Sequence, residues 1–336
     1  MKQRARIYSI LLIVCLLMGC GKTFDIQETE NIKTDEENLI VVGVSQVGSE
    51  SVWRTANTTS LQQTFTRENG YLMIFNNARQ KQENQIKAIR SFISRGVDYI
   101  VFSPITEEGW DTVLTEAKDA GIPVILMDRK IKTEDESLYA AWVGSDFEKE
   151  GNDAGIWLEE HLKSQGRQEE IIHILVLLGT EGSSAVLGRQ EGFDHVLKAH
   201  SNWKVLEYID AEYTTAKANE EMRKALIRHG DIDVVISQND DMTFGAIDAI
   251  KAAGLNPGME NDDILLVSFD AVRDALELVQ DGIIGVDVEC NPNQGKYIDE
   301  IIQAMEKGYY YEKNTYVKEQ TFTRDNVEQY IEERTY

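Results

Sequence analysis

Residues 39–54 read LIVVGVSQVGSESVWR, and this stretch decides the fold. Leu39–Val44 is a run of apolar residues rich in Ile and Val, which is typical of a strand buried on both faces. A polar turn follows, and Trp53 and Arg54 begin a helical pattern for which Ser49 or Ser51 is available as the N-cap. A buried strand that leads through a polar turn into a helix is the repeating unit of parallel α/β sheets.

The same unit recurs along the chain. Further apolar runs predict strands at Leu72–Asn76, Tyr99–Ser103, Val124–Met127, Ile172–Leu178, Val234–Ser237 and Ile264–Phe269. Helical spacing of apolar residues predicts helices at Trp53–Asn69, Gln82–Arg95, Trp110–Ala120, Phe147–Lys163, Arg189–Ala199, Ala216–Arg228, Met242–Ala253 and Ala271–Asp281. Glycines follow helix ends, where a left-handed cap favours them, at Gly70, Gly96, Gly121, Gly230 and Gly254. Four strand–helix units precede residues 138–143 and four follow, so we predict an α/β fold of two doubly wound parallel-sheet lobes.

The N-terminal segment has the layout of an export signal. A basic start precedes the apolar run Ile7–Met18, which is shorter than the ~20 residues that a membrane span needs. The sequence Leu17-Met18-Gly19-Cys20 resembles the lipobox of bacterial lipoproteins, which implies cleavage after residue 19 and a lipid on the sulfur of Cys20. A plain signal peptide (residues 1–19) with an incidental cysteine is the alternative.

The composition of the remaining chain limits which structures and partners are expected. Residues 20–38 are polar and charged with few apolar residues, and we expect a disordered tether. Beyond it Cys290 has no second cysteine to pair with, so we expect a small buried residue there. The formal net charge of −24 argues against binding to nucleic acid or to anionic lipid headgroups.

Polar residues follow the carboxyl ends of several predicted strands. They are Glu50–Arg54, the pair Asp128-Arg129, the loop 179–184 with Arg189 beyond it, Asn239–Asp241, and Asp270. Ligands of open α/β sheets bind at this rim. Carboxylates, guanidiniums and amides satisfy both the donor and the acceptor of a sugar hydroxyl, and a ring such as Trp53 packs on the apolar face of a sugar.

Each of these residues also has a purely structural interpretation. The Asp128-Arg129 pair is compatible with a surface ion pair, and Trp53 with a core residue. The run Asn239-Asp240-Asp241 is compatible with a helix cap, and Asp240 and Asp241 suit a cap better than a ligand contact. Their common placement on one rim favours a binding site.

Three segments carry a resemblance to a known family. Gly43–Ser51, Gln80–Phe92 and Met127–Arg129 resemble the galactofuranose-binding family of periplasmic proteins, within the ribose-binding-like, type I substrate-binding proteins of ABC sugar importers. The resemblance implies sugar contacts at Glu50, Ser51, Trp53, Arg54, Asp128, Arg129, Arg189, Asn239 and Asp270. It places a second aromatic plate at Tyr213 and a weaker candidate at Glu289. Val52 departs from the family, which has glycine there.

The resemblance also implies a topology and partners. The chain would cross between the lobes near residues 143–145, 289–291 and 317–320, which gives lobe one residues 39–143 and 290–317 and lobe two residues 144–289 and 318–336. Hinge closure would trap a monosaccharide, galactofuranose or a related furanose, and the closed form would dock on an ABC permease. We therefore expect a monomer, lipid-anchored on the extracytoplasmic face of the cell membrane, with no cofactor or metal.

Two other functions compete with transport. A glycosidase would use a pair among Glu50, Asp128 and Asp270, but arginine neighbours would keep these groups ionised, and no nucleophile elbow, Walker or zinc motif occurs. A sensor would present sugar occupancy to a membrane histidine kinase or chemoreceptor. The chain itself does not separate sensing from transport.

Overall fold

The computed structural model describes residues 39–336. The predicted signal segment, the tether and Cys20 lie outside the described residues and stay predictions. Within residues 39–336 no helix is long and apolar enough to cross a membrane.

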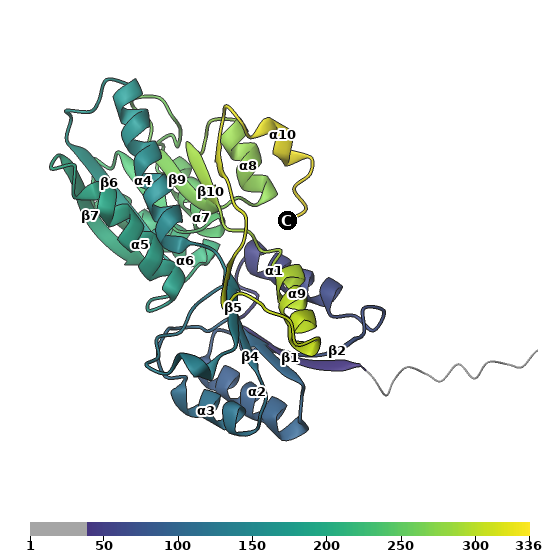
Figure 1. Cartoon of the computed structure of the whole chain (residues 1–336). Coiled ribbons are helices and arrows are strands. Elements are labelled where there is room, and N and C mark those ends of the chain that lie inside the picture. Colours follow the sequence, from purple (N-terminus) through teal and green to yellow (C-terminus); the bar gives the residue numbers. More distant parts are fainter. Residues whose placement is uncertain (1–38) are drawn as a thin grey trace, which may run out of the picture. The chain divides into compact units, whose positions relative to one another are not determined.

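The first sheet has six strands in the order β11-β5-β4-β3-β1-β2, all parallel (Figure 1). The strands are β1 (Ile40–Gln46), β2 (Tyr71–Asn77), β3 (Tyr99–Phe102), β4 (Val124–Met127), β5 (Ala141–Gly144) and β11 (Asn314–Tyr316). Helices α1 (Val52–Thr64) and α9 (Gly295–Glu306) pack on one face, and α2 (Gln82–Arg95) and α3 (Asp111–Asp119) pack on the other. The short 3-10 helix η2 (Glu136–Leu138) precedes β5.

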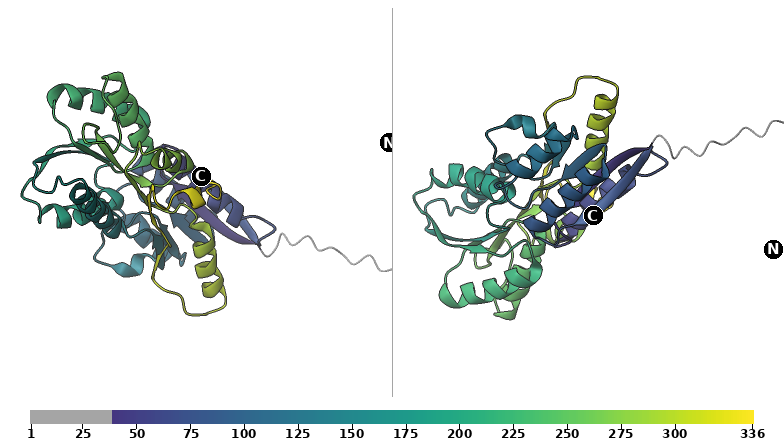
Figure 2. Two further views of the ribbon diagram at one scale, coloured as in Figure 1. Left: turned by 90° about the horizontal axis from the view of Figure 1, so that it is seen from above. Right: turned by 90° about the horizontal axis from the view of Figure 1, so that it is seen from below.

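The second sheet has the order β12-β10-β9-β8-β6-β7, and only β12 is antiparallel among its pairs. The strands are β6 (Ile172–Leu178), β7 (Trp203–Asp210), β8 (Val234–Ser237), β9 (Leu265–Asp270), β10 (Val286–Glu289) and β12 (Thr321–Thr323). Helices α4 (Phe147–Ser164) and α5 (Ser184–Leu197) cover one face. Helices α6 (Thr215–Arg228), α7 (Asp240–Ala252), α8 (Arg273–Gln280) and α10 (Glu328–Ile331) cover the other, as the views of Figure 2 show.

Burial explains why these runs form central strands. Every residue of β3, β4, β5, β8, β9 and β10 is buried, as expected for parallel strands covered by helices on both faces. The chain passes between the two sheets three times, after β5, after β10 and between β11 and β12. The predicted class, two doubly wound α/β lobes, is confirmed. The residue limits of the lobes stay a prediction.

The close packing of α4 on α5 depends on two glycines. A Cβ on Gly151 would lie 2.0 Å from the carbonyl oxygen of Arg189, and one on Gly192 would lie 1.9 Å from that of Glu148. Only glycine allows the two backbones to approach this far. The approach brings Arg189 of α5 beside Glu150 of α4.

Several elements differ from the prediction. Strands β5, β7, β10, β11 and β12 and helices α9 and α10 were not predicted. Strand β7 at the sheet edge is half-exposed without a continuous apolar run, and the apolar residues of β10 alternate with acidic ones. Strands β11 and β12 and helix α10 have only three or four residues. Helix α1 ends at Thr64, not at residue 69, and α5 begins at Ser184, five residues before the predicted start. Left-handed glycines follow helix ends at positions 96, 121 and 254, as predicted. Gly70 is left-handed but lies in the turn before β2, six residues beyond the end of α1, so it does not cap that helix. Gly230 is not left-handed, since His229 already leaves α6 in an extended conformation.

Candidate ligand-binding site

The ten residues predicted as ligand contacts line a single pocket. The empty space between the lining atoms is about 300 Å³. The lining consists of Glu50, Ser51, Trp53, Arg54, Asp128, Arg129, Phe147, Ala185, Arg189, Tyr213, Asn239, Asp270 and Cys290. The structure thus brings together residues from loops after both sheets, while their role as ligand contacts stays a prediction.

The N-terminus of α1 aims two of these side chains inward. Of the two serines proposed as caps, Ser51 is the N-cap, and its Oγ accepts from the backbone N–H of Arg54 (3.0 Å). Ser49 instead accepts from Nδ2 of Asn77 (2.9 Å). With the helix start fixed in this way, Trp53 and Arg54 are both buried at the pocket.

Arg54 connects two carboxylates. Its Nε donates to Glu50 Oε1 (3.0 Å) and its Nη1 to Asp128 Oδ2 (2.7 Å). Burial lowers the pKa of Arg54, but the charges of Asp128 and Glu50 raise it by more, so that the pKa lies above its usual value. The other oxygen of Glu50, Oε2, is buried and has no hydrogen-bond partner among the described residues.

The pair after β4 is buried, so the interpretation as a surface ion pair is wrong. Asp128 and Arg129 are 3% and 2% exposed. Asp128 has a left-handed φ of 61°, and its Oδ2 also accepts from Ser103 Oγ (2.9 Å). Arg129 donates from Nη1 to the carbonyl of Ile105 (2.9 Å), while its Nε has no hydrogen-bond partner in the described chain.

Arg189 is held from three directions. Its Nε donates to Glu150 Oε2 (2.6 Å), its Nη1 to the carbonyl of Gln238 (2.5 Å) and its Nη2 to Asp270 Oδ1 (3.5 Å). Burial raises the pKa of Asp270 well above its usual range, and the charge of Arg189 opposes that shift. Burial likewise raises the pKa of Glu150 to about 7.

Asn239 is both a cap and a pocket residue. Its Oδ1 accepts from the N–H of Met242 (2.9 Å) as the N-cap of α7, and this leaves its amide NH₂ as the group available to a ligand. Asp240 and Asp241 do not line the pocket, and neither is the N-cap. Asp240 accepts from the N–H of Val272 (2.8 Å), and Asp241 accepts from the N–H of Val52 at the start of α1 (3.0 Å).

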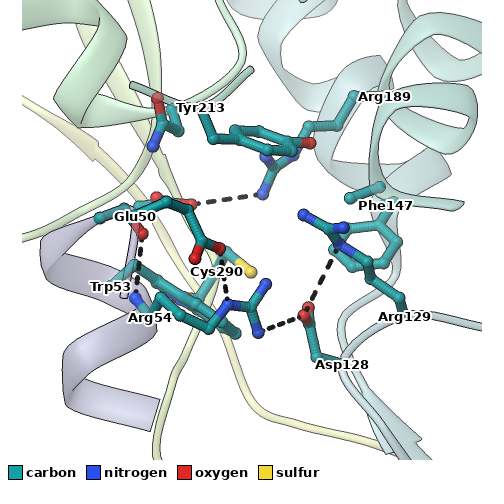
Figure 3. A pocket seen from close by; sticks show the side chains of 13 residues that line it. Glu50, Trp53, Arg54, Asp128, Arg129, Phe147, Arg189, Tyr213 and Cys290 are labelled. Carbon is teal, nitrogen blue, oxygen red and sulfur yellow. Dashed lines mark hydrogen bonds and ion pairs between the residues drawn. The ribbon is translucent and has the colours of Figure 1, made fainter. Parts of the chain in front are cut away.

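Aromatic rings line opposite sides of the pocket (Figure 3). Trp53 belongs to the core and to the pocket at once, because it is 4% exposed and donates from Nε1 to the carbonyl of Cys290 (2.5 Å). Across the pocket lies Tyr213, whose ring centroid is 5.3 Å from Cζ of Arg129. The Tyr213 hydroxyl is buried without a hydrogen-bond partner within residues 39–336.

Three residues that line the pocket were not predicted, and Glu289, the weaker candidate, lies outside the pocket. Phe147 and Cys290 follow β5 and β10, two strands that were not predicted, so their place on the rim was not visible. Ala185 has no polar side chain to mark it. Glu289 does not line the pocket; it accepts from Arg334 Nη1 (2.6 Å) and from the N–H of Gln320 (3.0 Å).

Loops from both lobes meet around this pocket. The N–H of Glu107 donates to the carbonyl of Gly182 (3.0 Å), and the N–H of Lys130 donates to Ser184 Oγ (2.8 Å). Three carboxylates (Glu50, Asp128, Asp270) and three guanidiniums (Arg54, Arg129, Arg189) line it, so their formal charges cancel. A pocket lined by buried charged groups between two α/β lobes is typical of a binding protein for a small solute.

The comparisons give the family. The chain belongs to the periplasmic binding protein domain family, which it matches over residues 42–309. It is 38% identical over 299 residues to the galactofuranose-binding protein YtfQ of Escherichia coli, covering 88% of this chain and 91% of the relative. This is a family of extracytoplasmic solute-binding proteins and not of enzymes, so the predicted family, type I fold and binding class are confirmed.

Solved structures agree with this assignment. The arabinose-transporter binding protein of Shewanella sp. ANA-3, bound to α- and β-L-arabinofuranose, is 40% identical with a TM-score of 0.81, over 88% of this chain and 95% of that one. The fructose-binding periplasmic domain of a hybrid two-component system is 26% identical with a TM-score of 0.78, over 88% and 94%.

Proposed function

We propose that the protein captures a monosaccharide in its furanose form, galactofuranose or a related sugar, between its two lobes. The observation that carries this proposal is the lining, in which three carboxyl groups and three guanidiniums surround one pocket. Such a lining offers donors and acceptors without favouring a charged solute, as a neutral polyol requires.

Unpartnered polar atoms support the same ligand class. Glu50 Oε2 can accept hydrogen bonds, Arg129 Nε can donate, and the Tyr213 hydroxyl can do either, yet all three are buried without a hydrogen-bond partner within the described chain. Arg129 Nε has only a long ion-pair contact, 4.0 Å, with Asp128 Oδ2. Buried polar groups need such partners, and sugar hydroxyls supply both kinds. The rings of Trp53, Phe147 and Tyr213 would pack on the C–H faces of the sugar.

The furanose preference comes from the relatives. One is named for galactofuranose, and another was solved with arabinofuranose. From the lipobox-like sequence Leu17–Cys20 we further propose that the protein is lipid-anchored at Cys20. From the family we propose that it is a monomer and delivers its sugar to an ABC permease.

Tryptophan fluorescence of the purified protein, titrated with galactose, arabinose, ribose, glucose and fructose, tests the proposal. We expect saturable binding of galactose or arabinose and little response to glucose. Methyl galactofuranoside and methyl galactopyranoside then separate the ring forms, because their rings do not interconvert. A Trp53→Phe variant shows whether the signal arises at the pocket. The absence of a fluorescence change with every sugar tested, or tighter binding of the pyranoside, would contradict the proposal.

A sensor role is the second candidate function. Its specific support is the similarity to a fructose-binding domain of a two-component system. Loss of sugar uptake in cells that lack the protein would support transport. Normal uptake with loss of a sugar-induced kinase response would support sensing instead.

A further inference from the structure

A second cluster of chemically reactive side chains lies where the chain passes between the sheets. Glu150 of α4, Cys290 after β10 and Glu319 between β11 and β12 each bring one side-chain oxygen or sulfur atom to within 4.8 Å of the other two. Ser145 joins them, since its Oγ lies 3.2 Å from Cys290 Sγ and donates to Glu319 Oε1. The cluster adjoins the sugar pocket, because Cys290 also lines that pocket, whereas Glu150 and Glu319 do not.

The cluster contains a buried oxygen without a partner. Glu150 is 3% exposed, and although its Oε2 accepts from Arg189, its Oε1 has no hydrogen-bond partner in residues 39–336. A buried carboxylate oxygen without a partner, beside a second carboxyl group and a thiol, is a position where a cation would supply the missing partner.

A groove leads from the surface to two of these residues. Its empty space is about 760 Å³, and it reaches Glu150 and Glu319. Its other charged lining residues are Asp146, Asp153, Glu289 and a single lysine, Lys149, which is paired with Asp153. An acidic groove of this kind concentrates cations at the cluster.

We propose that Glu150, Cys290 and Glu319 form a binding site for a thiophilic divalent cation, with Zn²⁺ as the reference. Thiolate sulfur and carboxylate oxygen are both ligands of Zn²⁺, and a hydroxyl or a water would complete four-coordination. Binding would displace the protons of Cys290 and Glu319, because metal ligands coordinate in their deprotonated forms. The site does not rest on the proposed sugar function.

The position of the site gives it a structural consequence. Cys290 and Glu319 lie on two of the three segments that connect the sheets. Glu150 lies on α4, the helix that follows the remaining connection, after β5. A cation held by all three would tie these connections together. Because Arg189 contacts Glu150 and also lines the sugar pocket, the two sites share a structural link.

Co²⁺ and Zn²⁺ binding to the purified, metal-stripped protein tests the proposal. Co²⁺ bound by a thiolate gives a near-ultraviolet charge-transfer band, and Zn²⁺ affinity is measured by competition with a chromophoric chelator. The variants are Cys290→Ser and Glu319→Gln. The control is His195→Asn, in the exposed cluster Glu148, Glu191 and His195, whose ligand atoms lie equally close together but at the surface.

We expect the Co²⁺ band in the unmodified protein and in His195→Asn, and its loss in Cys290→Ser. Zn²⁺ affinity should fall at least about tenfold in both cluster variants, since even outer-shell substitutions cost about 10–100-fold. Glu319→Gln should fold, because an amide resembles a protonated carboxyl, and it keeps the band at a weaker affinity. The absence of a Co²⁺ band in the unmodified protein would overturn the proposal. A Zn²⁺ affinity that falls only in His195→Asn would overturn it as well.

Discussion

The ring of Tyr213 lies directly on the backbone of Gly179, so that a Cβ at position 179 would be 1.9 Å from Tyr213 Cζ. Gly179 follows β6, and Tyr213, in a left-handed conformation with φ of 58°, follows β7. The absence of a side chain at 179 therefore decides where the aromatic ring of the second lobe stands in the pocket.

Substitution of Gly179 should displace that ring. Because the contacting atoms belong to a rigid ring, Gly179→Ala should push Tyr213 into the pocket and weaken sugar affinity at least about tenfold, which is ~1.4 kcal/mol. Overpacking should also destabilise the fold by ~1–3 kcal/mol. Fluorescence titration and thermal denaturation measure the two effects. Gly230→Ala, where a Cβ meets nothing within 4 Å, is the matched control, and equal affinities of the two variants would contradict the prediction.

Removal of Arg189 should weaken sugar binding at least about tenfold without unfolding the protein. The variant Arg189→Ala loses the guanidinium donors of the pocket, and the raised pKa values of Asp270 and Glu150 let these carboxyls take up protons and keep the fold. Titration calorimetry measures the affinity and circular dichroism the fold. Unchanged affinity in a natively folded variant would show that Arg189 does not contact the sugar.

Trp53 is both a core residue and a pocket residue, and two variants separate these roles. Trp53→Ala should weaken sugar binding at least about tenfold and, because Trp53 is a core residue, also destabilise the protein by ~3–5 kcal/mol. Trp53→Phe retains a ring for packing on the sugar and should keep most of the affinity. Calorimetry below the melting temperature of both variants is the measurement, and full affinity in Trp53→Ala would refute stacking.

Asp241 should stabilise the closed form without contacting the sugar. Its Oδ2 accepts from the N–H of Val52, which joins α7 of the second lobe to the N-terminus of α1 in the first. Asp241→Ala should release the sugar about two- to tenfold faster, the equivalent of the ~0.5–1.5 kcal/mol of one hydrogen bond. Stopped-flow fluorescence measures the rate. Asp241→Asn retains an acceptor oxygen and should release the sugar more slowly than the alanine variant, so identical rates would contradict the assignment.

Glu319 should make stability depend on pH. Its pKa is raised from 4.5 to about 9, so between these values the folded chain binds more protons than the unfolded chain and stability falls as pH rises. Glu319→Gln keeps the oxygen that accepts from Ser145 and Asn291 but does not titrate. With a chelator present, the variant should have the same melting temperature as the unmodified protein near pH 5 and a higher one near pH 9. Parallel melting curves across this range would be inconsistent with the assignment, and Glu332→Gln, at an exposed glutamate, is the control.

The sequence predicted the elements that carry a continuous apolar run. Strands β4, β6 and β8 have the bounds that were predicted, since a strand covered on both faces consists mostly of consecutive apolar residues. The edge strand β7 and the short strand β10 lack that signal. Their absence from the prediction also hid Cys290, which follows β10.

By itself the sequence determined that polar residues gather at one rim, because the carboxyl ends of parallel strands meet at the same edge of a sheet. Which atoms of those residues remain available to a ligand was decided only by the tertiary structure. The bond from Val52 to Asp241 joins residues 189 positions apart, and Arg54 meets Asp128 across 74 positions. The first contact depends on how the two lobes pack together, and the second depends on the strand order β4-β3-β1 within the first sheet. No local pattern along the chain records either arrangement.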